Sequence, residues 1–432
     1  MNSRFFGPQN LSQREVMSMA AVALTGFLLS SAHPAIIAVS VVMPAIVMCQ
    51  STRRAAFALG AVYYAAALWP LIPGARNFFG PDVSALVAIG LWVSASLLLA
   101  LPWLLVWSPC RREALWRAPA GIILTVCPPL GIIGWASPLT AAGILFPGTG
   151  WWGLFFCAVS TGALAVWPAR TASLLIALSF ALNTSFHPTP PPLEWEAVNT
   201  AFGGVAHGNT DPIAEYADAQ WIQEKALTTE AKVLIFPETV VPTWTPATDT
   251  FWQQTLDHLR PSGKTILVGA RIPIPWHDAA PARYDFAADL AVLGGERLPM
   301  FSTTDSRAGQ RTEAGFPYDN ALIVRGVETG AFQQRIPVPI GMWNPLKRMS
   351  ARLNLNGSGV IDIHGQRAAV LICYEQLLTW PVLISMAQRP TVLVAVANDY
   401  WVADTPIPSF QLAAVRAWAR LFRLPYLSAV NT

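Results

Sequence analysis

The sequence has little charge, and the charge it has is unevenly spread. Only 12% of its 432 residues are Asp, Glu, Lys or Arg, against about 25% in ordinary soluble proteins. Residues 1–192 contain no lysine, nine arginines and three acids, whereas both signs of charge are frequent after residue 192. The formal net charge of +3 also lacks the basic excess typical of nucleic-acid-binding proteins, so we expect no direct nucleic-acid partner. A charge deficit confined to the first half predicts membrane segments there.

The five cysteines do not form a disulfide or metal-binding pattern. Cys373 is the single cysteine after residue 192, and no CxxC or CxxH motif surrounds it. We therefore expect no metal and no cofactor. The other four lie in or beside apolar segments, where a thiol is usually a small buried apolar group: Cys49, Cys110, Cys127 and Cys157.

Long apolar runs fill the first half of the chain. A helix needs roughly 20 mostly apolar residues to cross a bilayer. By this measure we expect about seven membrane-spanning helices in a domain of residues 1–190, joined by the proline-rich HPTPPP at 187–192 to a second domain of residues 191–432. The expected spans are Val16–Ala32, Ala35–Cys49, Ala55–Ile72, Ser84–Trp107, Ala118–Trp135, Trp151–Trp167 and Ala172–Phe186.

The arginines predict how these segments are oriented. Eight of them precede the first expected span or lie in alternate loops, and the other loops carry only Arg76. Because positive residues stay on the cytoplasmic side, we expect a cytoplasmic N-terminus, a multi-pass protein of the bacterial inner membrane, and a periplasmic second domain. The eight are Arg4, Arg14, Arg53, Arg54, Arg111, Arg112, Arg117 and Arg170.

The second half alternates between short β-type runs and helical periods. This alternation predicts a layered α/β domain. The expected helices cover 211–228 and 408–422, with Arg416 and Arg420 on the charged face of the latter. The expected strands cover 232–239, 264–272, 320–326, 368–375 and 391–399.

Polar groups follow three of these strands: Glu238, Cys373 and the pair Asn398–Asp399. Sites gather at the carboxyl ends of strands in α/β sheets. Taken singly, Glu238 fits a loop carboxylate and Cys373 a buried inert thiol. Taken together, they fit a nucleophile with its general base, since a thiol must lose its proton to attack.

At this point the motifs resemble a known family. FPET (236–239) and ICYE (372–375) resemble the glutamate and cysteine motifs of the nitrilase, or carbon–nitrogen hydrolase, superfamily. Several helices before such a domain resemble apolipoprotein N-acyltransferase, as do AHGN (206–209) and VPIG (338–341). The conjugal-transfer TraB proteins of plasmids are the most similar in type. The resemblance implies a nitrilase-like αββα sandwich for residues 191–432.

The resemblance also implies roles for individual residues. Glu238 corresponds to the family's base, Cys373 to its nucleophile and Glu375 to a supporting carboxylate. Tyr374 follows the nucleophile, where the family uses the backbone N–H to hold the oxyanion.

The family's lysine has no counterpart here. Five residues before Pro339, where the family has that lysine, stands Gln334, and the next residue is Arg335. Arginine is a permanent cation but a poor proton shuttle, and it replaces the lysine only if the register shifts by one residue.

Two hypotheses follow. In the first, the protein serves plasmid transfer as an enzyme that transfers or hydrolyses an acyl or amide group through a Cys373 thioester, acting on a membrane lipid or a membrane-tethered protein. In the second, the site no longer turns over, and the protein is a membrane-anchored scaffold that contacts other conjugal-transfer proteins.

Overall fold

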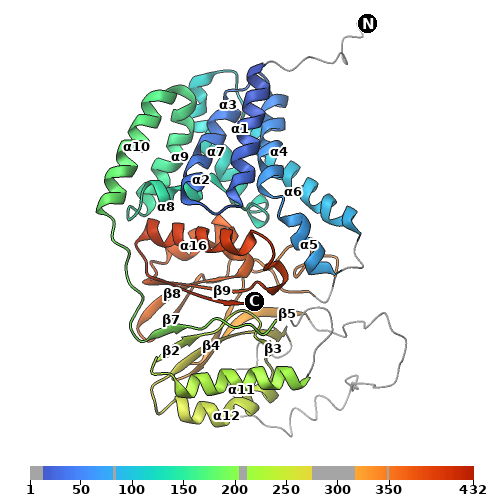
Figure 1. Ribbon diagram of the computed structural model, residues 1–432, viewed down its shortest axis with the longest axis vertical. Helices are drawn as coiled ribbons and strands as arrows, with labels where there is room; N and C mark the ends of the chain where they lie inside the picture. Colours follow the sequence, from blue (N-terminus) through green and yellow to red (C-terminus); the bar gives the residue numbers. More distant parts are fainter. Residues whose placement is uncertain (1–12, 81–83, 204–211, 275–316, 348–349) are drawn as a thin grey trace. The chain divides into compact units, whose positions relative to one another are not determined.

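A computed structural model of the protein describes residues 13–80, 84–203, 212–274, 317–347 and 350–432 (Figure 1). The AHGN motif and Arg4 lie outside these ranges. The residues pack into two compact units, which are not simple halves of the chain. Unit 1 comprises residues 1–192, 358–395 and 399–428, and unit 2 comprises 193–357, 396–398 and 429–432. The expected division into domains 1–190 and 191–432 stays a prediction.

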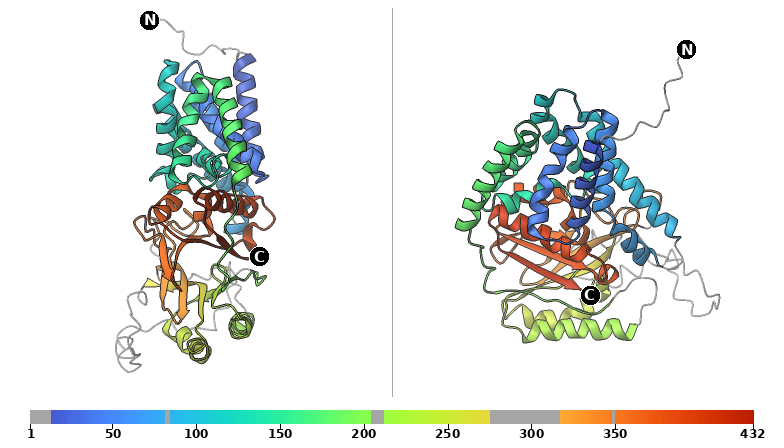
Figure 2. Two further views of the ribbon diagram at one scale, coloured as in Figure 1. Left: turned by 90° about the vertical axis from the view of Figure 1, so that its left-hand side faces the viewer. Right: turned by 45° about the horizontal axis from the view of Figure 1, so that its top comes forward.

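Helices make up the N-terminal part of unit 1 (Figures 1 and 2). Within it α1 packs against α4, α4 against α6, and α7 against α9. The helices are α1 (Gln13–Leu29), α2 (Pro34–Val39), α3 (Met43–Met48), α4 (Arg53–Ala67), α5 (Leu71–Phe79), α6 (Ala85–Val106), α7 (Ala114–Val126), α8 (Ala142–Leu145), α9 (Trp151–Val166) and α10 (Pro168–Ser185).

The expectation of about seven membrane-spanning helices is wrong. In the described part of the chain, α6 alone is long and apolar enough to cross a membrane, and α4 with α5 would make a second only if this pair, bent by 53°, is one span. The expected second span is divided into α2 and α3 by a 3₁₀ turn at Ser40–Val42, and a proline lies within the first two residues of each helix. Hydropathy averages over such breaks, whereas proline and tight turns interrupt the helix itself.

The remainder of unit 1 comes from the C-terminal part of the chain. A sheet with strand order β10-β9-β8-β7 carries the helices α15 and α16. Helix α16 packs against α8, and a Cβ added at Gly143 of α8 would lie 1.8 Å from the carbonyl oxygen of Ala417. The elements are β7 (Val360–Ile363), β8 (Gln366–Ile372), α15 (Thr379–Ala387), β9 (Val392–Asn398), α16 (Ile407–Phe422) and β10 (Tyr426–Asn431), of which the ends of β9 and β10 count with unit 2.

Unit 2 is built on a mixed sheet. Its strand order is β1-β2-β4-β5-β6, with β3 paired to β4; β1, β2 and β4 are parallel, and β5 runs antiparallel to β4. Apolar residues of α11 and α12 form one core cluster with the sheet, including Trp252, Leu256 and Ile266. The elements are β1 (Trp195–Ala197), α11 (Pro212–Thr228), β2 (Val233–Ile235), β3 (Val241–Thr243), α12 (Pro246–Leu259), β4 (Thr265–Pro273), β5 (Tyr318–Gly326) and β6 (Gly330–Gln333).

The five expected strands are confirmed as β2, β4, β5, β8 and β9, and the two expected helices as α11 and α16. The prediction that strands and helices alternate in the second half of the chain is therefore confirmed, and the sheet of unit 2 is mixed. The face-to-face packing of the two sheets as a sandwich stays a prediction.

Candidate active site

Glu238 lies just beyond the buried strand β2 and is itself buried, with 4% of its surface exposed. Its backbone passes close to β4: a Cβ added at Gly269 of β4 would lie 2.5 Å from the Glu238 Cα. Glycine is thus the residue that lets the FPET segment approach β4 this closely.

Both carboxylate oxygens of Glu238 accept hydrogen bonds within unit 2. The side-chain amide of Asn320 donates to Oε1 at 2.5 Å, and the backbone N–H of Asn398 donates to Oε2 at 3.0 Å. Hydrogen bonds of this kind favour the charged form of a carboxyl group. The surroundings therefore suit Glu238 as an ionised acceptor, the form that a general base needs.

Gln334, at the position of the family's lysine, belongs to the same network. It is fully buried; its backbone N–H donates to the Asn320 carbonyl at 2.8 Å, and its Oε1 accepts from the Asn320 amide at 2.8 Å. Arg335 is also buried, with its guanidinium carbon 5.8 Å from the ring centroid of Phe332. The structure thus places an amide, and next to it in sequence a buried cation, where the family has a single lysine.

Cys373 follows β8 and opens a 3₁₀ turn (Cys373–Leu377) in unit 1. Its backbone has φ of +48°, a left-handed conformation that is strained for a residue with a Cβ. Its carbonyl oxygen accepts a hydrogen bond from the side chain of Gln411, on α16, at 3.1 Å. The thiol residue is thus buried and held by a helix that packs against α8.

The two residues after Cys373 fasten the same turn. Glu375 is fully buried and accepts the backbone N–H of Ile372 at 3.1 Å. Tyr374 donates its hydroxyl to the carbonyl of Ile132 at 3.0 Å, and burial raises the pKa of Tyr374 above its usual range. Tyr374 therefore stays neutral. Its role as a backbone oxyanion donor stays a prediction.

The described residues thus form two groups. In unit 2, Glu238 and Gln334 share Asn320 as a hydrogen-bond partner. In unit 1, Cys373, Tyr374 and Glu375 occupy one turn. The pairing of the Glu238 carboxylate with the Cys373 thiol, which the motifs predict, joins residues of different units and stays a prediction.

Sequence reasoning did not assign a site role to Asn320 or Gln411. Asn320 had a usable signal, because it is a polar residue at the start of the otherwise apolar run ALIV. Gln411 lies in a helix of ordinary amphipathic pattern, so the sequence carries no comparable signal for it.

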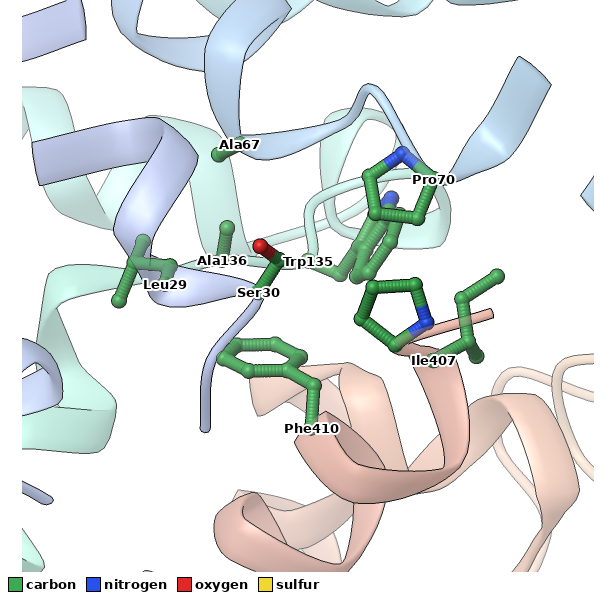
Figure 3. Close-up of a pocket in the computed structure, with 9 residues that line it drawn as sticks. Leu29, Ser30, Ala67, Pro70, Trp135, Ala136, Ile407 and Phe410 are labelled. Carbon is green, nitrogen blue, oxygen red and sulfur yellow. The ribbon is translucent and has the colours of Figure 1, made fainter. Parts of the chain in front are cut away.

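Two further features to consider in the described part of the chain are a metal centre and a pocket. Within the described ranges, no three His, Cys, Asp or Glu residues come together in a way that could hold a metal ion. A small pocket in unit 1, shown in Figure 3, is lined by apolar groups and the Ser30 hydroxyl, which donates to the Phe27 carbonyl at 2.6 Å. It marks the junction where the start of α16 meets the end of α1 and the loop at Trp135.

No protein-family model matches the chain. Over 88% of its length it is 31% identical to conjugal transfer protein TraB of Agrobacterium fabrum, covering 84% of that protein. Over 97% of its length it is 28% identical to probable conjugal transfer protein TraB of Sinorhizobium fredii, covering 98% of that protein. It is also 26% identical, over 56% of its length, to apolipoprotein N-acyltransferase of Verminephrobacter eiseniae, covering 43% of that protein.

Among solved structures, an amidase from Nesterenkonia sp. matches 55% of this chain and 74% of its own, at 13% identity and a TM-score of 0.34. At that score the likeness adds nothing to what the chain's own sheets show. These curated relatives confirm the resemblance to conjugal transfer TraB proteins and to apolipoprotein N-acyltransferase. With 31% identity to a TraB protein over most of both sequences, the chain belongs to the family of conjugal transfer TraB proteins.

Proposed function

We propose that this chain is an inner-membrane protein of plasmid conjugal transfer that transfers or hydrolyses an acyl group through a thioester on Cys373. The names of its TraB relatives support the role in conjugation. The observation that carries the chemistry is the backbone of Cys373, buried after β8 at a φ of +48°. Strained residues that are fixed by their surroundings cluster at functional sites, and Gln411 and Glu375 fix this turn.

In the proposed reaction the Cys373 sulfur attacks the carbonyl carbon of an acyl donor, and Glu238 takes the thiol proton. The tetrahedral oxyanion collapses, the bond to the leaving group breaks, and that group departs with the proton from Glu238. An amine or a water molecule then attacks the thioester, giving an amide or a carboxylic acid and restoring the thiol. Arg335, Gln334 and the N–H of Tyr374 are the candidate donors to the oxyanion.

The helices of unit 1 support a membrane location. Large apolar side chains are exposed on them, with exposures of 75% at Leu86 and 68% at Leu105 of α6, 69% at Trp152 of α9 and 72% at Phe180 of α10. Soluble proteins rarely expose apolar surface over several elements, whereas a bilayer covers it. We propose a bundle in the inner membrane with its N-terminus in the cytoplasm, which would bring a lipid or a membrane-tethered protein substrate to the protein.

Mass spectrometry of the purified full-length protein tests the chemistry. After incubation with phospholipid or lipoprotein acyl donors, we expect an acyl adduct on the peptide that contains Cys373. A Cys373→Ser variant should carry no hydroxylamine-labile adduct, whereas Cys110→Ser should be labelled like the unmodified chain. Absence of an adduct from every donor would refute the enzymatic proposal.

A second candidate function is a scaffold without turnover, and Gln334 favours it. A neutral amide held by Asn320 stands where the family has a cationic lysine, and loss of one oxyanion donor typically costs about 10²–10³ in rate. This alternative predicts that Cys373→Ala supports normal plasmid transfer while deletion of residues 193–432 abolishes it. A transfer defect in the point variant, with the protein present at its usual level in the membrane, would favour the enzyme.

A further inference from the structure

Asn320 is the residue through which the elements around Glu238 are joined. It is 1% exposed, near the start of β5, and every polar group of its side chain is occupied. Its amide nitrogen donates to Glu238 Oε1 at 2.5 Å and to Gln334 Oε1 at 2.8 Å. Its amide oxygen accepts from the Thr239 hydroxyl at 3.2 Å.

These bonds leave the Asn320 side chain a single orientation. The hydroxyl of Thr239 supplies a proton to Oδ1, so Nδ2 must face the two acceptors, Glu238 and Gln334. The backbone strengthens this arrangement, since the Asn320 carbonyl accepts the N–H of Gln334. A primary amide has two N–H donors, and both are used.

The second oxygen of Glu238 is held from another direction. Its donor is the backbone N–H of Asn398, and the Asn398 side chain is fixed in turn by Asn431, whose Nδ2 donates to Asn398 Oδ1 at 2.9 Å. Asn431 Oδ1 accepts from Thr200 and from the N–H of Phe202. The Glu238 carboxylate is therefore hydrogen-bonded to the end of β9, which is itself hydrogen-bonded to the end of β10.

We infer that Asn320 is the positioning residue of the general base: its amide orients the Glu238 carboxylate, keeps it ionised, and couples it to the residue at position 334. This inference rests on the proposed function, in which Glu238 takes the Cys373 proton. Aspartate is nearly the same shape but cannot donate when ionised, and it would set a second negative charge beside Glu238. Two carboxyl groups that share a site cannot both ionise readily, so one pKa rises strongly.

The test is a pH profile of Cys373 alkylation in the full-length protein. Iodoacetamide labels the protein at pH values from about 3 to 8, which span the usual pKa of a glutamate (about 4.3) and stay below that of a thiol (about 8.5), and mass spectrometry quantifies the Cys373 peptide. In this range the rate of Cys373 alkylation should rise as Glu238 ionises, and this rising part of the profile is called its acidic limb. Four variants are compared with the unmodified chain: Asn320→Asp, Asn320→Thr, Asn199→Asp and Glu238→Gln.

For Asn320→Asp we expect the acidic limb to move upward by about one pH unit or more, since Glu238 then ionises later. Asn320→Thr, which adds no charge but cannot bridge both acceptors, should move the limb upward by less. Asn199→Asp is the matched control for added charge, because the Asn199 Oδ1 that accepts the Val430 N–H is preserved as a carboxylate oxygen. Its profile should not move.

The Glu238→Gln variant separates the two proposals. If it keeps the acidic limb, Glu238 is not the base, and the proposed function and this inference both fail. If it loses the limb while both Asn320 variants match the unmodified chain, Asn320 is not the positioning residue and the proposed function stands. Should Asn320→Asp fail to fold, Asn320→Thr decides alone.

Discussion

At the scale of single residues, the backbone of Cys373 is the most informative feature. Left-handed φ values are normal for glycine but cost an alanine-like residue roughly 1–2 kcal/mol. The chain nevertheless keeps a cysteine at φ of +48°, in a turn fastened by Glu375 and by Gln411. A thiol whose only task is to fill space would gain nothing from this position.

This strain gives a prediction that does not depend on the substrate. Both Cys373→Gly and Cys373→Ala remove the thiol, and in an ordinary strand or helix alanine would be the more stable by about 0.5–1 kcal/mol. Here we expect the order to be reversed, with the glycine variant more stable by about 1 kcal/mol, because glycine adopts positive φ without strain. Chemical denaturation of the two variants in detergent measures the difference. A more stable alanine variant would mean that the backbone is not left-handed there.

The sequence indicated the candidate base and nucleophile more readily than the residues that hydrogen-bond around them. FPET and ICYE are short motifs in which a glutamate and a cysteine follow apolar runs, so Glu238 and Cys373 are visible from pattern alone. Asn320 acquires its importance only from where its amide points, and that depends on the pairing of β5 with β4. Residue type and spacing do not encode such an orientation.

At the scale of elements, one ion pair ties β1 to α11. Glu196 pairs with Lys225 at 2.7 Å and accepts the Thr229 hydroxyl at 2.6 Å. The hydrogen bond from Lys225, and then that from Thr229, lowers the pKa of Glu196 below its usual 4.5. The folded state therefore binds this proton less tightly than the unfolded chain does.

The sign of the pH effect follows from that shift. Because the pKa of Glu196 is lower in the folded protein, its ionised carboxylate stabilises the fold at pH values above the pKa of the unfolded chain, near 4.5. This contribution is lost as the pH falls through the lower pKa of the folded state. Because the pair is partly exposed, we expect at most about 1 kcal/mol. The Glu196→Gln variant should be less stable than the unmodified chain at pH 7 and should approach it near pH 3, as measured by denaturant titration. A constant difference across this range would contradict the assignment.

The contact between α8 and α16 combines close packing with polar bonds. Arg420, expected on the charged face of a helix, instead donates to the Gly143 carbonyl at 3.3 Å and to Asn183 of α10 at 2.5 Å. Arg416 is exposed, as expected. Helix α16 thus carries both the support of Cys373 and the bonds to α8 and α10, so a disturbance of α8 should reach the thiol.

Gly143→Ala tests this contact. The added Cβ would lie 1.8 Å from the Ala417 carbonyl oxygen, so α16 must move, and we expect a loss of about 2 kcal/mol or more in unfolding free energy. Gly90→Ala on α6 is the matched control, because nothing lies within 4 Å of its added Cβ. That variant should be unchanged or slightly more stable. Equal stability of the two variants would exclude a close α8–α16 packing.

The elements themselves were largely predictable where apolar runs are uninterrupted. Strands β2, β4, β5, β8 and β9 follow from short buried runs bounded by polar or turn residues. The expected membrane spans were predicted too long, because hydropathy does not register the 3₁₀ turn between α2 and α3 or the bend between α4 and α5. The packing of α16 on α8 was unpredictable, since it depends on one glycine meeting one backbone carbonyl.

At the scale of the whole molecule, the chain order does not determine the packing units. Residues 358–428, apart from the end of β9, group with the N-terminal helices, while residues 193–357 form the body of the other unit. The proposed nucleophile thus belongs to the unit that carries the N-terminal helices, and the proposed base to the other. Catalysis by Cys373 and Glu238 accordingly requires the two units to place these residues together.

Crosslinking tests this requirement without any knowledge of the substrate. In a Glu238→Cys variant of the full-length protein, the new thiol should be joined to Cys373 by a short bis-electrophilic reagent, since a base in proton-transfer range of a nucleophile lies within reach of it. Peptide mass spectrometry identifies the linked pair and separates it from links to the cysteines of the helical part. Glu230→Cys is the matched control, because residue 230 precedes β2 in the same unit but is no part of the Glu238 network. A link to Cys373 from position 238 and not from position 230 would establish that the two units form one active site. The reverse result, or equal linking from both, would leave Cys373 without the base proposed for it and would favour the scaffold.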